Sequence, residues 1–118
     1  MASVARQKQP AGRKRNPDEI DIVNDPRGRR VIFEWQRWAG HVRQRHPEMA
    51  PYYGLALETV SQPDAIYRTK LDSPWEGEAY YKFFEPRATL MVVVRNGYMV
   101  TVRFAAARRS KSEVKIWP

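Results

Sequence analysis

The chain has 118 residues, which is the length of a single domain with one hydrophobic core. Because 42% of the residues are hydrophobic, a wholly disordered chain is excluded, and because cysteine is absent, disulfides and cysteine-ligated metals are excluded too. The 21 Lys and Arg residues outnumber the 13 Asp and Glu residues, and the net charge of +8 points to a polyanionic partner: nucleic acid or, less often, an anionic membrane.

The positive charge is concentrated at the two ends of the chain. Residues 1–16 contain five basic residues and no acidic one, and residues 101–118 contain five basic residues and one acidic one. No apolar run approaches the roughly 20 residues of a membrane span, and the basic N-terminus lacks the apolar stretch of a secretory signal. We therefore expect a basic, largely disordered tail over residues 1–26, a single domain over residues 27–118, a cytoplasmic location and no membrane partner.

The first expected elements are a turn, a strand and a helix. Residues 26–28 have the Pro and Gly of a turn, and residues 31–33 form a short apolar strand. A helix is predicted over residues 34–45 because its apolar residues recur at helical spacing, and Pro47 ends it. The stripe that faces the core comprises Trp35, Trp38, Ala39, Val42 and His46.

A second helix and two strands follow. The apolar spacing predicts a helix over residues 52–61, which Pro63 terminates. Strands are expected over residues 65–68 and 78–85, with a Pro- and Gly-containing loop over residues 71–77 between them.

The strongest structural signal is a hairpin. Asn96-Gly97 lies between two β-branched runs, which is typical of a two-residue turn. A regular ladder then pairs Val94 with Met99, Val92 with Thr101, and Leu90 with Arg103. The alternate set is more apolar and is expected to face the core beneath the helices, which leaves Thr101 and Arg103 together on the opposite face. That set comprises Met91, Val93, Val100, Val102 and Phe104, and a last edge strand is expected over residues 114–117.

The order of elements predicts an α+β fold. Two N-terminal helices should pack on one face of an antiparallel sheet of about four to five strands.

One block of residues resembles a known nuclease family. The segment Trp38-Ala-Gly-His41-Val-Arg43-Gln-Arg45-His46-Pro47-Glu48-Met49 is similar to a motif of phage and mobile-element nucleases, the phage relatives of the barnase–EndoU–colicin–RelE-like (BECR) superfamily. Residues 58–66, Tyr80-Tyr81-Lys82, the valines 92–94, Thr101 and a Trp near the end follow in the family's order. The resemblance covers residues 31–117. It implies a BECR fold and a metal-independent RNA-cutting domain without a cofactor.

The residue types present suit that chemistry. Metal-free RNA cleavage needs a base for the 2′-hydroxyl, an acid for the leaving 5′-oxygen, and cations for the charge on phosphate. His41 is the first candidate for general base or acid, because it lies beside the apolar stripe and can face a cleft; an ordinary surface histidine is the alternative. Thr101 and His46 complete the catalytic candidates. The place of His46 in the apolar stripe favours packing on the core instead.

The basic residues are candidates for binding RNA phosphate. Tyr81 and Tyr98 are candidates for base stacking, although aromatic side chains in a small domain are more often part of the core. Tyr81 and Lys82 point to opposite faces of their strand, so we expect one of them to face the cleft. The phosphate candidates are Arg45, Arg103, Lys82, Arg108, Arg109 and Lys111.

Two functions from different classes fit the sequence. The first is a metal-independent endoribonuclease of phage or toxin type, encoded by a phage or delivered into a host cell, with RNA as substrate and an inhibitor or immunity protein as a further candidate partner. The second is a noncatalytic nucleic-acid-binding or regulatory module of the same fold, which binds through its two basic ends and weakens with salt. A virion structural component is a more distant alternative.

Overall fold

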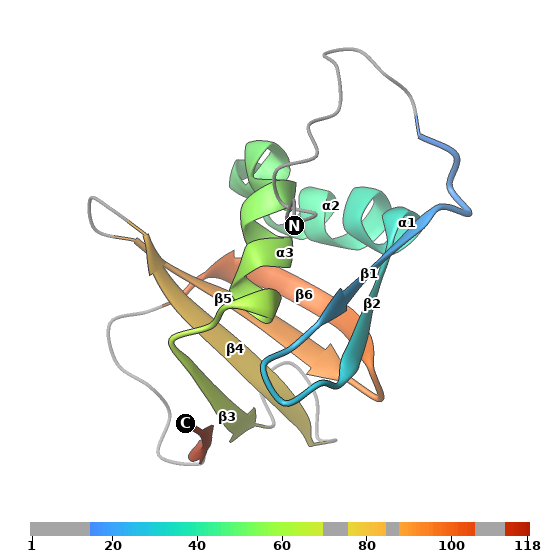
Figure 1. The fold of residues 1–118 in the computed structure, drawn as a ribbon. Coiled ribbons are helices and arrows are strands. Elements are labelled where there is room, and N and C mark those ends of the chain that lie inside the picture. Colours follow the sequence, from blue (N-terminus) through green and yellow to red (C-terminus); the bar gives the residue numbers. More distant parts are fainter. Residues whose placement is uncertain (1–14, 70–75, 85–87, 106–112) are drawn as a thin grey trace.

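The computed structural model describes residues 15–69, 76–84, 88–105 and 113–118. A seven-stranded sheet has the order β1-β2-β6-β5-β4-β3-β7 (Figure 1). Its strands are β1 (Ile20–Asn24), β2 (Arg30–Glu34), β3 (Ala65–Thr69), β4 (Gly77–Phe84), β5 (Ala88–Arg95), β6 (Tyr98–Phe104) and β7 (Val114–Trp117). The helical elements are α1 (Trp35–Arg37), η2 (Trp38–Val42), α2 (Arg43–Arg45), η3 (Pro47–Tyr52) and α3 (Tyr53–Ser61).

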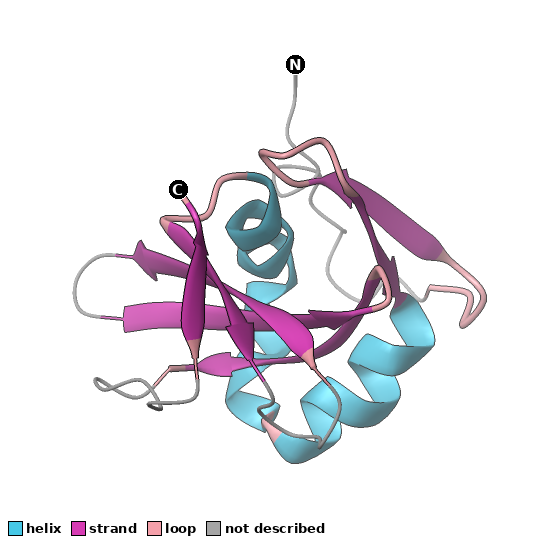
Figure 2. Cartoon of the chain, turned by 90° about the horizontal axis from the view of Figure 1, so that it is seen from below, coloured by secondary structure: helices cyan, strands magenta, loops and turns pink. Residues whose placement is uncertain are grey.

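The α+β fold class is confirmed, but the sheet is larger and less regular than predicted. It has seven strands instead of four to five, and the β2–β6 pair is parallel, whereas every other neighbouring pair is antiparallel. The parallel contact is short and has one paired position, Ile32 with Tyr98. The β1–β2 hairpin therefore diverges from the rest of the sheet, as Figure 2 shows.

The predicted boundary between tail and domain at residue 27 is wrong. Residues 20–24 form β1, which pairs with β2 along its whole length. Sequence patterning missed this strand because Ile20 and Ile22 point outward and are exposed, so its apolar residues do not mark a buried face. Arg15 fixes the chain before β1: its guanidinium lies 4.8 Å from the Trp35 ring centroid and forms ion pairs with Glu19 and Asp21.

The two predicted helices are confirmed. The first is a continuous segment over residues 35–45, but its middle, η2, is a π-helical turn in which the Arg43 N–H donates to the carbonyl of Trp38, five residues earlier. Such turns often occur at functional sites. The segment ends at His46, and Pro47 begins a 3₁₀ turn where its missing N–H costs no helical hydrogen bond.

The main core lies between the helices and one face of the sheet, which we call the helix face. Helix α3 packs across β4 and β5 and also contacts β1 (Figure 1). Trp38 is fully buried and meets the ring of Tyr53 edge-on, at 4.9 Å between ring centroids. The sheet contributes buried side chains from six strands, β1 to β6: Val23, Val31, Phe33, Ile66, Tyr80, Leu90, Val92, Val94, Met99 and Val102.

The hairpin turn is confirmed, but its predicted register holds for only two pairs. Asn96 and Gly97 have φ angles of 55° and 82°, as a two-residue turn that matches the strand twist requires. Arg95 pairs with Tyr98 and Val94 with Met99, and then a β-bulge at Val100 shifts β6 by one residue. The pairs beyond the bulge are Val93–Thr101, Val92–Val102, Met91–Arg103 and Leu90–Phe104.

The bulge changes which side chains face the helices. Leu90, Val92 and Val94 belong to the main core, so the expectation that Met91 and Val93 face it is wrong. Met91 and Val93 instead join a smaller cluster on the opposite face of the sheet, which we call the far face, together with Ala79, Tyr81 and the half-buried Tyr67, Val100 and Ala105. Thr101 and Arg103 still share one face, and because they pair with Val93 and Met91 that face is the far face, as predicted.

Candidate functional site

The far face brings three of the predicted site residues together. Met91 pairs with Arg103 on one side and with Tyr81 on the other, so these side chains form one row across β6, β5 and β4. Because neighbouring strands lie about 4.8 Å apart, the Arg103 and Tyr81 backbones are separated by roughly 10 Å. Thr101 occupies the next row, opposite Val93. Thr101 is only 3% exposed, whereas Arg103 is half-buried, so Arg103 is the more accessible of the two.

A carboxylate that the sequence analysis did not select extends this face. The Tyr81 hydroxyl donates to Glu113 at 2.8 Å, and the Thr69 hydroxyl donates to the same carboxylate at 3.2 Å. The ring of Tyr67 packs edge-on against that of Tyr81, at 5.5 Å between centroids. Glu113 is the one acidic residue in the basic C-terminal stretch, which is the signal that could have drawn attention to it.

His41 belongs to η2, which contacts β6, the strand that carries Thr101 and Arg103. Four residues before His41, the Arg37 Nε donates to the backbone carbonyl of Val100 at 2.8 Å and so ties the helical segment to the bulge. The His41 side chain is half-buried.

Three other candidates lie elsewhere. Lys82 is on the helix face, where its Nζ donates to the Gln62 carbonyl at 2.8 Å, just after the end of α3. Tyr98 is exposed at the hairpin turn, next to β2. The Nδ1 of His46 lies 3.8 Å from Glu48, between α2 and η3.

Arg45 is exposed at the end of α2. The predictions for Arg108, Arg109 and Lys111 fall outside the described residues.

A second polar region links the β1–β2 turn to the start of β4 on the helix face. Asp25 is 4% exposed and accepts hydrogen bonds from the Tyr80 hydroxyl at 2.8 Å and from Arg27 at 2.7 Å. Arg27 also reaches Glu78 at 2.6 Å, and Arg29 contacts the other oxygen of Glu78 at 3.2 Å. We call these residues the Asp25 network.

The Asp25 network holds its charges in fixed ionisation states. Burial raises the pKa of Asp25, but the hydrogen bonds from Tyr80, from Arg27 and from the backbone N–H groups of Arg29 and Arg27 outweigh burial, so the pKa lies below its ordinary value. Burial and the hydrogen bond to Asp25 raise the pKa of Tyr80. The hydrogen bond to Glu78 raises the pKa of Arg27 despite its burial.

Two further features constrain the site. Among the described residues, no three His, Asp or Glu side chains are grouped so that they could hold a metal ion. In the same part of the chain, no helix is both long and apolar enough to cross a membrane.

Comparison with family models, with curated proteins and with solved structures finds no match for this chain.

Proposed function

We propose that the protein is a metal-independent endoribonuclease of the BECR type, and that RNA binds at the edge of the far face beside η2. The observation that carries the proposal is the juxtaposition of the helical segment bearing His41 with the strand bearing Thr101 and Arg103. Histidine and arginine provide a proton acceptor and a phosphate ligand, which are two of the groups that cleavage without a metal requires.

In this proposal each residue has a separate role. His41 takes the proton of the 2′-hydroxyl, the 2′-oxygen attacks the adjacent phosphorus, and the bond from phosphorus to the 5′-oxygen breaks. Arg103 binds the phosphate as its negative charge increases, and the departing 5′-oxygen takes a proton from solvent. Thr101 is buried, so we assign it a positioning role beneath Arg103. Tyr81, held by Glu113, extends the face away from His41.

The test is incubation of the full chain with total RNA in EDTA. Wild-type protein should produce fragments with 2′,3′-cyclic phosphate ends, and His41→Ala should reduce the rate by at least about a hundredfold, since general acid–base catalysis typically contributes 10²–10⁴-fold. His46→Ala is the matched control and should retain activity, because the His46 Nδ1 lies 3.8 Å from Glu48, between α2 and η3. Full activity of His41→Ala would remove His41 from the mechanism.

A noncatalytic nucleic-acid-binding module is the second candidate. The burial of the Thr101 hydroxyl favours it, because that hydroxyl is not available to hold a reacting phosphate. This function predicts RNA binding that weakens with salt, no cleavage under any condition, and equal binding by wild type and His41→Ala. Cleavage in EDTA would contradict it.

A further inference from the structure

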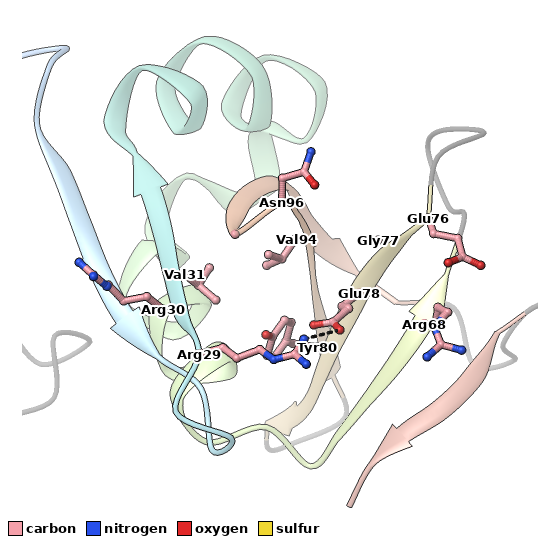
Figure 3. Close-up of a pocket in the computed structure, with 11 residues that line it drawn as sticks. Arg29, Arg30, Val31, Arg68, Glu76, Gly77, Glu78, Tyr80, Val94 and Asn96 are labelled. Carbon is pink, nitrogen blue, oxygen red and sulfur yellow. Dashed lines mark hydrogen bonds and ion pairs between the residues drawn. The ribbon is translucent and has the colours of Figure 1, made fainter.

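A cavity on the helix face lies at the end of the sheet that contains the β5–β6 turn. Its volume is about 280 Å³, and it opens between the start of β2, the β5–β6 turn and the start of β4 (Figure 3). Val31 and Val94 form an apolar wall, and Gly77 and Gly97 contribute backbone. Charged side chains also line the cavity: Arg29, Arg30, Arg68, Glu76 and Glu78.

Glu78, one of the two acidic residues that line the cavity, is already neutralised by arginines. Glu78 is bound by Arg27 at 2.6 Å and by Arg29 at 3.2 Å, as part of the Asp25 network. Arg29 uses one of its nitrogen atoms for this contact and its side chain is 64% exposed, so its remaining N–H groups are accessible from the cavity.

Arg68 is left available by this arrangement. It lies directly opposite Glu78 in the β3–β4 ladder, a position at which opposite charges ordinarily pair. The Glu78 carboxylate turns instead to Arg27 and Arg29, so Arg68 is exposed and has no ion pair or hydrogen bond from its side chain within the described part of the chain. Figure 3 shows Arg29 and Arg68 on either side of Glu78.

We propose that this cavity binds one nucleotide through its phosphate, with Arg68 and Arg29 as the phosphate ligands. The planar guanidinium group matches phosphate geometry in two hydrogen bonds, and two such groups flank the cavity. The apolar wall of Val31 and Val94 accommodates a flat base. The volume lies just below the roughly 300–1,000 Å³ of pockets for drug-sized ligands, which suits one nucleotide and not a longer segment.

The nucleotide is either free or part of an RNA strand. The cavity lies on the opposite face of the sheet from the proposed cleavage site. If the nucleotide is part of an RNA strand, the cavity therefore holds a part of the substrate that is distant from the cleaved bond. That version rests on the proposed function, whereas binding of a free nucleotide does not.

The experiment measures binding of adenosine 5′-monophosphate, inorganic phosphate and a ten-nucleotide RNA to the full chain by calorimetry. The RNA measurement uses the His41→Ala variant, so that cleavage does not interfere. Arg68→Ala should weaken nucleotide binding about tenfold or more, which corresponds to the loss of a charged hydrogen bond. Glu76→Gln should strengthen it a few-fold, because Glu76 is the remaining negative charge at the cavity. Arg43→Ala, an exposed arginine on α2, is the matched control and should leave affinity unchanged.

The outcomes separate the alternatives. An Arg68→Ala effect on both the mononucleotide and RNA assigns the cavity to a nucleotide as such, and an effect on RNA alone assigns it to a strand; both support the proposal. Equal losses in Arg68→Ala and Arg43→Ala overturn it, since they indicate only general charge attraction. Preferential, Arg68-dependent binding of a poly-glutamate peptide also overturns it, in favour of an acidic protein partner.

RNA cleavage in EDTA is scored separately. If the protein cleaves RNA and Arg68→Ala has no effect on nucleotide binding, the proposed function is supported and the nucleotide site is contradicted. If nucleotide binding depends on Arg68 but the protein cuts no RNA, the nucleotide site is supported and the proposed function is contradicted.

Discussion

Two neighbouring tyrosines on β4 show how the polar groups on the two faces of the sheet differ. Tyr80 points to the helix face and donates its hydroxyl to Asp25, whereas Tyr81 points to the far face and donates to Glu113. Both carboxylates come from distant parts of the chain. The Asp25 carboxylate is fully buried and bound by Arg27, whereas Glu113 is half-buried and accepts hydrogen bonds from the hydroxyl groups of Tyr81 and Thr69. The helix face thus uses its polar groups for rigidity, and the far face keeps its polar groups closer to solvent.

The largest expected difference between the two faces is in how much their side chains contribute to the free energy of unfolding. Trp38→Ala empties the centre of the main core and should reduce the free energy of unfolding by about 3–5 kcal/mol. Phe83 is 47% exposed on β4, and Phe83→Ala should change the same quantity by less than about 1 kcal/mol. Urea denaturation followed by fluorescence measures both. If both substitutions reduced the free energy of unfolding by similar amounts, Phe83 would belong to a second core that stabilises the fold as much as the main core does.

The Asp25 network should make stability depend on acid. Because the pKa of Asp25 is lower in the folded than in the unfolded state, its contribution is present above the unfolded pKa of about 3.9 and is lost as pH falls through the folded value. Asp25→Asn should therefore cost about 1–3 kcal/mol at pH 7 and less at pH 3. Denaturation at both values measures this change, with the exposed Asp18→Asn as control. An equal deficit at both pH values would contradict it.

The smallest effect concerns the tyrosine hydroxyls. Tyr81→Phe removes one donor to a half-buried carboxylate and should cost about 0.5–1 kcal/mol, whereas Tyr80→Phe leaves a buried carboxylate short of a donor and should cost about 1–2 kcal/mol. Thermal unfolding of the two variants makes the comparison, since both retain the aromatic ring. A larger cost for Tyr81→Phe would show that the far face is as tightly organised as the helix face.

Sequence patterns predicted the individual helices, turns and strands better than they predicted which strands pair and in which register. The helices, the Asn96-Gly97 turn and the last edge strand follow from local patterns, because apolar spacing and turn geometry are properties of adjacent residues. Strand β1 could not be found this way, since its isoleucines face outward. The register of β6 could not be found either, because a bulge leaves no mark in an alternating run of apolar residues.

The candidate site was accessible to sequence reasoning only in part. Thr101 and Arg103 were placed on the correct face, but through a register that the bulge alters. Glu113 lies 32 residues after Tyr81 along the chain and joins it because β7 pairs with β3, which is a tertiary contact that no local pattern shows. The Asp25 network likewise depends on the folding of the β1–β2 turn against β4, so no local pattern identifies it.

The bulge at Val100 makes the chemistry of the far face depend on the length of a strand and not only on its composition. Regular pairing of the same residues would place Thr101 and Arg103 beneath the helices in place of Val102, whereas removing Val100 would restore a regular ladder and leave Thr101 and Arg103 on the far face. When related chains are compared, a one-residue gap at Val100 is therefore compatible with the same far face, whereas a one-residue gap between Thr101 and Arg103 would turn Arg103 toward the helices.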